Sequence, residues 1–396
     1  MSPPPSGCRD TGAVRAFLEE RHLDLADRIE EFARSSLASL PEPAGDGAAR
    51  AQARDILGLL GGRGWYQPIL EQDLRALCLI REAVASASPL ADAVYALQAL
   101  GSTPIVLAGS SDLRERWLPA MARGEAMAAF AMTEPEAGSD VASITTAARR
   151  DGNDWILDGV KTFISNAGIA DFYTVFVSTE PGRGHRGISC FVVPSDAPGF
   201  VFEGEQILSA PHPLGTIRFD GCRIRADSLV GEEGQGFKVG LATLDRLRAT
   251  VAAAACGMAA RALDEALVHA RERRQFGKPL AEFQLVQEKL ARMATDLVAA
   301  RLLTYRAAWE KDRGAERVTV EAAMAKAFAT EAAQRIVDDA VQILGGRGVL
   351  AEHPVDRLYR SIRALRIYEG TTEIQQLVIA GKLIERTGAA SRAGDS

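Results

Sequence analysis

Residues 155–177 read WILDGVKTFISNAGIADFYTVFV, and this stretch decides the fold class. Short runs rich in Val, Ile, Phe and Trp alternate in it with Gly, Asp and Asn, as in strands joined by turns. Further outward, the same pattern predicts strands at 155–157, 163–164, 173–177, 188–193, 200–202 and 217–219, with turns at 151–153, 158–159 and 181–182. Short strands at roughly ten-residue spacing predict an antiparallel barrel or sandwich of about 100 residues.

The segments before Ala128 and after Gly234 have helical periodicity instead. Apolar residues recur at helical spacing from Val14 to Leu40, and the pattern resumes at 56–60, 70–84 and 91–107. Ala-rich helices are expected at 236–273, 281–312, 318–344 and 371–387, and their short connections predict an antiparallel bundle. The predicted fold class is α+β, with an N-terminal helical domain at 1–127, a middle antiparallel β-barrel at 128–232 and a C-terminal four-helix bundle at 233–396.

The composition limits the classes of function. The 396 residues include 46 Lys and Arg against 52 Asp and Glu, a net charge of −6 that offers no basic surface for nucleic acid or a membrane. The most apolar run, Ala249–Ala260, is too short to cross a bilayer, and the N-terminus lacks the apolar core of a signal peptide. Five scattered cysteines predict reduced thiols. We therefore expect a cytoplasmic protein that binds neither nucleic acid nor membranes.

Several common catalytic motifs are missing from the sequence. Gly277-Lys278 is followed by Pro279 rather than Ser or Thr, so there is no P-loop, and no G-x-G-x-x-G follows an expected strand. There is also no G-x-S-x-G motif of the kind that carries a serine nucleophile. The five histidines lie far apart and match no metal-binding spacing, so no metal site is expected.

Two polar features each allow two interpretations. The segment TEPEAGSD at 133–140 lies at the junction between helices and strands. It is either a domain-crossing loop held by local hydrogen bonds or a polar loop that faces a ligand. Arg248 falls on the apolar stripe of the 236–273 helix, three residues from Asp245. It either forms a buried structural ion pair or contacts an anionic or polar ligand.

Two further features lie at expected helix ends. The basic segment RERRQFGK at 271–278 either caps a helix or holds a diphosphate. The segment QILGGRG at 342–348 is either a simple helix stop or a glycine turn that lets a ligand approach the backbone closely.

The segment IYEGTTEIQ at 367–375 is the most informative of all. Thr372 and Gln375 fit a capping box for the last long helix, which places Glu369 just outside that helix between a Tyr and a Gly. Desolvation in such a niche raises the pKa of a carboxyl group, as a general base near neutral pH requires. A solvated glutamate before a helix is the second interpretation.

In this order and at these separations, four stretches resemble the acyl-CoA dehydrogenase family: FAMTEPEAGSDVAS at 130–143, RERRQFGKPLAEFQ at 271–284, VQILGGRG at 341–348 and IYEGTTEIQ at 367–375. The resemblance extends from about residue 14 to 387 and implies that family's fold of a helical, a β and a second helical domain. It implies FAD-dependent α,β-dehydrogenation of an acyl-CoA thioester, in which Glu369 removes the α-proton and flavin N5 takes the β-hydride. Some subfamilies carry the base on the 236–273 helix, but the matching residue here is Leu247.

The resemblance also implies the binding residues. Those expected to bind FAD within the chain are Phe130, Met132, Thr133, Gly138, Ser139, Phe163, Ile164, Ser165, Thr371 and Glu373. Those expected to reach FAD from a neighbouring subunit are Arg273, Gln275, Phe276, Gln284, Gln342, Gly345 and Gly346. Those expected to contact the thioester are Ser139, Asp245, Arg248, Tyr368 and Gly370. Shared cofactor sites imply at least a dimer, and family members are commonly tetramers.

The substrate is expected to be a short, branched or small cyclic acyl group, because Tyr95, Leu97 and Leu100 would shorten the acyl pocket. The chain departs from many family members at Phe163, where Trp is common, and at 209–219, where Pro211-His212-Pro213 replaces a polar stretch. The substrate could therefore be an acyl-carrier-protein thioester instead of acyl-CoA. An electron-transferring flavoprotein is the expected electron acceptor. Two further functions fit the same fold: an oxygen-reactive oxidase or flavin monooxygenase, and a catalytically silent scaffold.

Overall fold

The computed structural model describes residues 11–393, and side-chain environments as far as residue 386. Cys8 lies outside the described residues. So does most of the N-terminal segment, in which no signal peptide is expected. Contacts divide the chain into two compact units. The helical unit comprises Met1–Leu40, Leu74–Pro89 and Asp245–Ser396, and the sheet unit comprises Pro41–Asp73 and Leu90–Leu244. The division into three domains at 127/128 and 232/233 stays a prediction.

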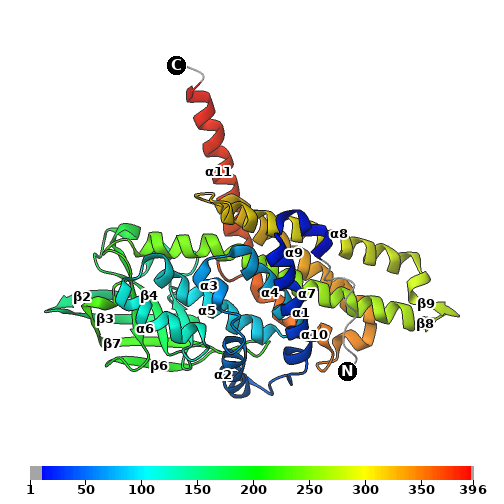
Figure 1. Cartoon of the computed structure of the whole chain (residues 1–396), viewed down its shortest axis with the longest axis horizontal. Helices are drawn as coiled ribbons and strands as arrows, with labels where there is room; N and C mark the ends of the chain where they lie inside the picture. The colour runs from blue at the N-terminus through cyan, green and yellow to red at the C-terminus, as the bar shows by residue number, and fades with distance from the viewer. Residues whose placement is uncertain (1–10, 394–396) are drawn as a thin grey trace. The chain divides into compact units, whose positions relative to one another are not determined.

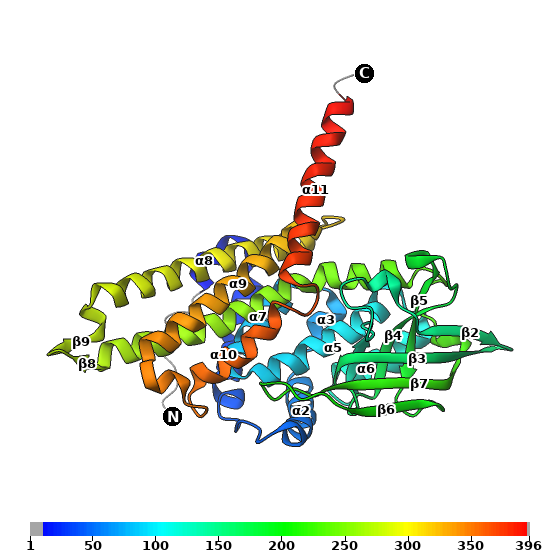
Figure 2. The same ribbon diagram turned by 180° about the vertical axis from the view of Figure 1, so that it is seen from behind.

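The sheet unit is built on one seven-stranded sheet, seen in green in Figures 1 and 2. Its strands are β1 (Ala128–Ala131), β2 (Ala147–Asp151), β3 (Asp154–Ser165), β4 (Phe172–Ser178), β5 (Ile188–Pro194), β6 (Phe200–Glu205) and β7 (Leu214–Arg225). The strand order is β1-β4-β2-β3-β7-β6, with β5 also on β4. The prediction of a wholly antiparallel barrel is wrong, because β1 and β4 pair in parallel with Phe130 opposite Thr174. The β2–β3 hairpin separates these two strands along the chain, so β4 returns to β1 by a crossover instead of a tight turn.

One predicted turn is wrong. Asp158-Gly159 lies inside β3, where the pairing with β7 shifts register between Leu157 and Gly159. Gly159 has φ of +144°, and a Cβ there would lie 2.6 Å from the Thr146 hydroxyl. The glycine therefore marks a β-bulge instead of a chain reversal. As a result, the predicted short strands at 155–157 and 163–164 are one long strand.

Helices α2 (Asp46–Gly61), α3 (Gln67–Glu71), α5 (Pro89–Ala108) and α6 (Ser111–Ala122) complete the sheet unit. Helix α5 is long and apolar enough by composition to cross a membrane, but 83% of its most apolar window is buried inside the fold. Gln98 on this helix accepts a hydrogen bond from the Ala128 N–H at 2.6 Å, and Thr174 on β4 donates one to the Gly101 carbonyl at 2.6 Å. Burial against the sheet therefore accounts for the apolar character of α5.

The helical unit holds η2 (Thr11–Phe17), α1 (Glu20–Phe32), η3 (Ala33–Leu37), α4 (Leu74–Ala87), most of α7 (Gly236–Glu272), α8 (Gln284–Asp312), α9 (Thr319–Leu344), η8 (Gly345–Val349), α10 (Pro354–Leu365) and α11 (Thr372–Ala393). Helix α8 packs on α9 and α4, and α9 also packs on α10 and α11. The four predicted long helices are present, but the structure adds α10 to them, and α4 joins them from the N-terminal third. The predicted helix at 14–40 is broken after Phe17.

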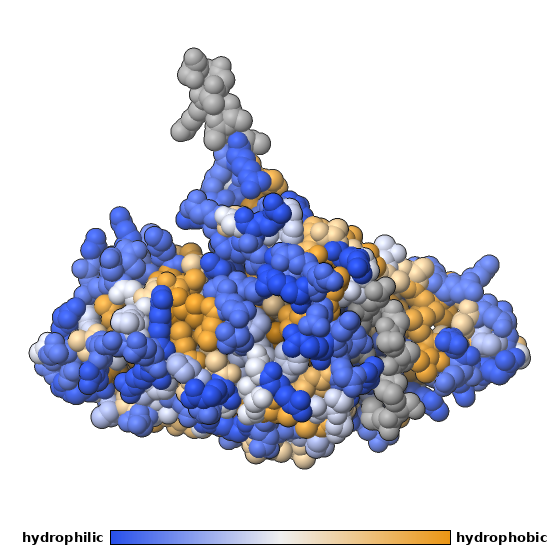
Figure 3. All heavy atoms as spheres, viewed as in Figure 1, coloured by the Kyte–Doolittle hydropathy of each residue, from blue (hydrophilic) through white to orange (hydrophobic). Residues whose placement is uncertain are grey.

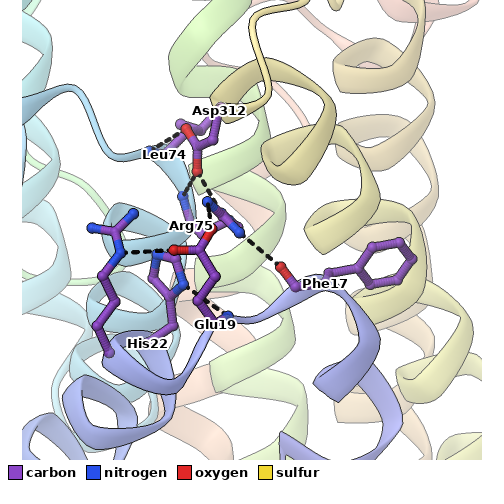
Figure 4. A network of polar contacts seen from close by, with 7 residues as sticks. Phe17, Glu19, His22, Leu74, Arg75 and Asp312 are labelled. Carbon is purple, nitrogen blue, oxygen red and sulfur yellow. Dashed lines mark hydrogen bonds and ion pairs between the residues drawn. The ribbon is translucent and has the colours of Figure 1, made fainter.

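A polar network ties the N-terminal helices to the end of α8, as Figure 4 shows. The Asp312 carboxylate accepts hydrogen bonds from the N–H groups of Leu74 and Arg75, at 2.9 and 3.0 Å, and from the Arg75 side chain at 2.8 Å. Arg75 also donates to the Phe17 carbonyl at 3.1 Å and to the Glu19 carboxylate at 2.8 Å. A carboxylate at the start of α4 satisfies N–H groups that have no partner within the helix.

Candidate active site

Glu369 lies in the short turn that joins α10 to α11 in the helical unit. Its backbone has φ of +54°, and Gly370 follows with φ of +89°. A left-handed conformation is costly for a residue with a side chain and persists at sites where the surrounding structure imposes it. The Oε2 atom of the Glu369 carboxylate is buried. The positive φ favours glycine at position 370, and a Cβ there, 2.6 Å from Nε2 of Gln375, would also have to displace this amide.

Three side chains from three helices hold the two carbonyl groups of this turn. Lys326 on α9 donates from Nζ to the Gly370 oxygen at 2.7 Å, and Gln375 on α11 donates from Nε2 to the same oxygen at 3.0 Å. Arg248 on α7 donates from Nε to the Glu369 oxygen at 3.4 Å, a longer contact. These contacts explain how the turn keeps two successive left-handed residues.

Arg248 is paired. Its Nη1 lies 2.6 Å from Oδ1 of Asp245, and Oδ2 of Asp245 accepts a hydrogen bond from the Thr319 hydroxyl at 2.7 Å. The ion pair expected from the spacing of the two residues is therefore present on the apolar stripe of α7. Leu247, the matching position for an alternative base, is a buried apolar side chain.

The start of α11 differs from the predicted capping box. The helix begins at Thr372, and Thr371 supplies the cap, since its hydroxyl accepts a hydrogen bond from the Ile374 N–H at 3.3 Å. Thr372 instead donates to the Glu331 carboxylate at 2.8 Å. Gln375 is not part of a box, because its amide turns back to the carbonyl groups of Glu369 and Gly370. The helix N-terminus and the Thr371 hydroxyl lower the pKa of Glu373.

In the sheet unit, the predicted loop at 133–140 begins directly after β1. Glu134 and Ala137 form a tight turn with backbone hydrogen bonds of 3.1 Å in both directions. The Glu134 carboxylate lies 2.7 Å from Nζ of Lys161 on β3, which is completely buried and also donates to the Met132 carbonyl at 3.1 Å. Gly138 and Ser139 are exposed at the end of the loop.

Burial and mutual attraction shift the pKa values of both Glu134 and Lys161. Burial acts to raise the pKa of Glu134, but the Lys161 cation and hydrogen bonds from Thr145 and Thr146 lower it to about 2. Burial lowers the pKa of Lys161 to about 8, against the opposing effect of Glu134. The pair anchors the loop to β3, since its members come from both segments.

Phe163 on β3 is both strained and exposed. Its φ is +54°, and 62% of the residue is accessible to solvent. Its N–H donates to Oε1 of Gln206 at 2.9 Å, and Nε2 of Gln206 donates to the Thr162 hydroxyl at 3.0 Å. The Thr162 N–H donates to the Thr133 carbonyl at 3.0 Å, which brings the predicted loop beside the predicted strand. An exposed aromatic ring in a strained backbone is typical of a functional position.

Ser165 lies at the end of β3, with its hydroxyl 2.7 Å from Nε2 of His212. The neighbouring Asn166, with φ of +62°, donates its N–H to the Pro213 carbonyl at 2.8 Å. Burial lowers the pKa of His212 to about 4, and the nearby Arg50 adds to this effect while Asp46 opposes it. His212 is therefore neutral at pH 7. Through His212 and Pro213, the unusual stretch at 209–219 forms hydrogen bonds with Ser165 and Asn166 at the end of the predicted cofactor strand.

The basic segment after α7 forms a small hairpin of β8 (Arg274–Gln275) and β9 (Lys278–Pro279). Phe276 and Gly277 form its two-residue turn with φ of +50° and +82°, as such turns require. Phe276 is 93% exposed at the tip, and Arg273, Gln275 and Gln284 are also exposed. Basic residues do lie in the last turn of α7, and the chain beyond it reverses as a hairpin, so both interpretations of this segment stay open.

The glycine turn after α9 lies near the same end of α7. Burial lowers the pKa of His269 on α7, and the charges of Arg347 and Arg273 add to this effect. The two arginines therefore lie close enough to act on one imidazole. Gln342, Gly345 and Gly346 are exposed there, and a Cβ at either glycine would meet nothing within 4 Å.

The structure groups the predicted residues into three sets. Within the sheet unit it brings together Phe130, Met132, Thr133, Phe163, Ile164 and Ser165 on β1, β3 and the adjoining loop, from which Gly138 and Ser139 extend. Within the helical unit, one set surrounds the turn of Glu369: Asp245, Arg248, Tyr368, Gly370, Thr371 and Glu373. The third set is the hairpin with Arg273, Gln275 and Phe276. This set is not brought to Glu369, because it lies at the opposite end of α8 from the start of α11 (Figures 1 and 2).

Four polar residues that form hydrogen bonds to these sets are absent from the predicted site residues: Lys326, Gln375, Gln206 and His212. The only sequence signal for His212 is its place in the stretch 209–219, where the chain departs from many family members. Lys326 has a recognisable signal, because a lysine in the run AAMAKAFA interrupts an otherwise apolar helix face. Gln206 has none, since its partner Phe163 is 43 residues away in the sequence and periodicity reports only on near neighbours.

Comparisons with known proteins agree with this architecture. Family models for the N-terminal, middle and C-terminal domains of acyl-CoA dehydrogenases match residues 13–125, 129–222 and 234–384. The chain is 40% identical over 374 residues to a probable acyl-CoA dehydrogenase FadE25 of Mycobacterium tuberculosis, covering 94% of each chain. It is 37% identical over 380 residues to the human mitochondrial short-chain specific acyl-CoA dehydrogenase, covering 95% of this chain and 88% of the relative.

A solved structure shows the same fold. The glutaryl-CoA dehydrogenase of Mycobacterium smegmatis in complex with FADH2 superposes with a TM-score of 0.84 at 28% identity, covering 93% of this chain and 96% of the other. The matched domains span nearly the whole chain and include each of the three sets of residues described above. The chain belongs to the acyl-CoA dehydrogenase family.

Proposed function

We propose that this protein is an FAD-dependent dehydrogenase of acyl-CoA thioesters in which Glu369 is the catalytic base. The observation that carries the proposal is the turn of Glu369, a carboxylate on a left-handed backbone that side chains of α7, α9 and α11 hold in place. A glutamate that three helices hold in a strained conformation is typical of a catalytic position. The family supplies the reaction class.

The residues present fit FAD. Phe163 offers an exposed ring on a strained backbone, and the Gly138, Gly345 and Gly346 backbones are open to a ligand, because a Cβ at any of them would meet nothing within 4 Å. The cations Arg273 and Arg347 suit a diphosphate. Within the chain, the proposed FAD-binding residues of the sheet unit are Phe130, Met132, Thr133, Gly138, Ser139, Phe163, Ile164 and Ser165, with Thr133 and residues 163–165 at the isoalloxazine ring. Thr371 and Glu373 are the proposed FAD-binding residues of the helical unit. The diphosphate and adenine would be held by a neighbouring subunit's Arg273, Gln275, Phe276, Gln284, Gln342, Gly345 and Gly346.

In the proposed reaction Glu369 removes the α-proton of the thioester. When bound, FAD supplies the acceptor for the hydride that leaves the β-carbon. The Glu369 N–H donates a hydrogen bond to the thioester carbonyl and stabilises the negative charge that develops on its oxygen. Asp245 and Arg248 are proposed to meet the CoA portion, and Tyr368 and Gly370 are proposed to bind the thioester. Ser139 is the proposed CoA contact of the sheet unit. Binding of substrate expels water from the carboxylate and makes it a stronger base.

We propose a short, branched or small cyclic acyl group as the substrate. Two observations support it. Tyr95, Leu97 and Leu100 fill space in the sheet unit, and the Tyr95 hydroxyl is fixed by a hydrogen bond of 3.1 Å to the Trp65 carbonyl. The human relative is by name specific for short chains.

We further propose a cytoplasmic homotetramer that passes electrons to an electron-transferring flavoprotein. Exposed apolar side chains support the assembly: Phe276 at the hairpin tip, Leu285 on α8, and Leu377 and Ile384 on α11. On the face shown in Figure 3, the described part of α11 is mainly hydrophilic, with a small apolar area beside it.

Anaerobic reduction of the purified protein tests the proposal. We expect a yellow protein whose flavin absorbance is bleached by acyl-CoA esters, with kcat/KM highest for short or branched chains. A steady rise from butanoyl to hexadecanoyl-CoA would contradict the small pocket. Reduction by a carrier-protein thioester alone would exclude CoA as the carrier, and rapid reoxidation in air with substrate bound would indicate an oxidase or monooxygenase. A colourless protein that binds no flavin would indicate a silent scaffold.

A further inference from the structure

We propose that Lys326 is a positioning residue for Glu369: its buried ammonium group holds the turn at Glu369–Gly370 and keeps the Glu369 carboxylate ionised before substrate binds. The inference rests on the proposed function and deepens it, since it states what makes Glu369 ready to accept a proton. Lys326 would act through Glu369 without touching the substrate.

The first support is geometric. Lys326 lies on α9 and is completely buried, although a lysine is almost never buried without a strong partner. Its Nζ donates to the Gly370 carbonyl at 2.7 Å, a charge-assisted hydrogen bond to the peptide that follows Glu369. Gln375 donates to the same oxygen at 3.0 Å, so two donors from two helices fix one carbonyl group.

The second support is the charge around Lys326. Burial lowers the pKa of Lys326 to about 8, and the Glu369 carboxylate opposes this more strongly than any other charge nearby. Arg248 adds to the lowering, while Glu331 and Glu373 oppose it more weakly. Since the interaction between two charges is mutual, the Lys326 cation favours the ionised form of Glu369.

The other charged groups near Lys326 either have ion-pair partners of their own or are exposed. Arg248 forms an ion pair of 2.6 Å with Asp245, and Glu331 forms one of 2.7 Å with Arg366. Glu373 is exposed at the first turn of α11. Lys326 is therefore the buried cation whose main electrostatic partner is the proposed base.

The competing explanation is that Lys326 only caps a carbonyl group and has no effect on proton transfer. Three substitutions separate the two explanations. Lys326→Met removes both the hydrogen bond and the charge. Lys326→Gln keeps an N–H donor but removes the charge, and Lys326→Arg keeps both. Thr330→Val, one turn further along α9, is the matched control, since its buried hydroxyl donates to the Lys326 carbonyl within the helix and not to the turn.

Two measurements on the FAD-loaded protein test the proposal. Hydrogen exchange of a peptide covering 366–376, followed by mass spectrometry, reports on the turn independently of activity. We expect Lys326→Met to speed exchange of this peptide by about tenfold or more, as for loss of a hydrogen bond from a charged donor. Lys326→Gln and Lys326→Arg should keep most of the protection, and Thr330→Val should match the parent protein.

The second measurement is the pH dependence of anaerobic flavin bleaching by the best acyl-CoA ester. The rate rises with pH as the base ionises, and we expect the midpoint of this rise to move up by about 1 unit or more in Lys326→Met and Lys326→Gln. In Lys326→Arg and Thr330→Val the midpoint should stay within about half a unit of the parent. A change in KM alone would not move this midpoint.

The outcomes are distinct. Unchanged exchange in Lys326→Met would overturn the positioning role, and an unchanged midpoint in both uncharged variants would overturn the electrostatic role. If Lys326→Met fails to fold, Lys326→Gln still decides the electrostatic question. If no thioester bleaches the parent protein, the proposed function itself fails and this inference fails with it, whereas normal bleaching of the parent with unshifted variants rejects this inference alone.

Discussion

The hydroxyl of Ser165 lies 2.7 Å from Nε2 of His212, which joins the strand expected to flank the flavin to the stretch where the chain departs from its family. His212 is held neutral, because burial lowers its pKa from 6.5 to about 4. The neutral ring shares a hydrogen bond with the serine hydroxyl. The pair therefore links the position of a predicted cofactor residue to the protonation state of a histidine.

The first prediction concerns acid stability. Between pH 6.5 and about 4 the unfolded chain binds a proton at His212 and the folded protein does not, so stability is present above pH 6.5 and is lost as the pH falls towards 4. We expect the parent protein to lose about 2 kcal/mol more free energy of unfolding than His212→Gln between pH 7 and pH 5. Urea unfolding at both pH values measures this difference, and parallel losses in the two proteins would contradict it.

The second prediction concerns the buried pair of Lys161 and Glu134. Lys161→Met leaves a buried carboxylate without its cation and should cost about 3–5 kcal/mol. The double variant Lys161→Met/Glu134→Gln should lose less than the sum of the single variants by about 2 kcal/mol or more. A double-mutant cycle by chemical unfolding measures the coupling. Additive losses would show that the pair does not stabilise the loop as a unit.

The third prediction concerns Phe163. Phe163→Gly relieves a left-handed strain of about 1–2 kcal/mol, which offsets the greater flexibility of glycine, so the cofactor-free protein should keep its stability. Loss of the exposed ring should weaken FAD binding by about 2- to 10-fold. Flavin fluorescence titration measures the affinity, with Phe163→Trp as the control that keeps a ring. Equal affinity in parent and glycine variant would argue against a flavin contact at this residue.

The fourth prediction concerns Glu369. Glu369→Gln keeps the shape of the side chain but cannot accept the α-proton, and buried Leu247 offers no substitute. We expect the variant to retain FAD and to bind thioester, while bleaching slows by about 10²–10⁴-fold. Exposed Glu352→Gln is the control for charge. Retention of more than about a tenth of the parent rate would reject Glu369 as the base.

The fifth prediction concerns Arg273, which lies beside the hairpin and acts electrostatically on His269. Arg273→Ala should lose more FAD on gel filtration than the parent while thioester affinity changes less, because its cation is proposed to face the diphosphate. Arg313→Ala removes an exposed cation beyond the end of α8 and is the control. Equal FAD content in the parent and Arg273→Ala would contradict the assignment.

The strands and long helices could be predicted because their signals are local. Alternation and turn residues identify the strands at 173–177 and 188–193, and helical periodicity identifies α7, α8 and α9 almost to their ends. The errors lie where a local signal has two physical causes. Gly159 carries the signal of a turn, but its freedom serves a bulge that depends on pairing with β7.

The sequence alone was sufficient to indicate the family and to select candidate residues for the chemistry, because both depend on side-chain types in a fixed order along the chain. It placed Glu369 just before a helix and paired Arg248 with Asp245, both of which depend on neighbours a few residues away. The conformation of the site was decided only by the tertiary structure. Beside the left-handed turn at Glu369, Lys326 holds the Gly370 carbonyl across 44 residues of sequence. At left-handed Phe163, Gln206 accepts the backbone N–H across 43 residues. A buried cation or amide stabilises such a strained conformation only when folding brings it to the carbonyl or N–H group with which it forms a hydrogen bond. A local sequence pattern cannot predict a contact between residues that lie so far apart in the chain.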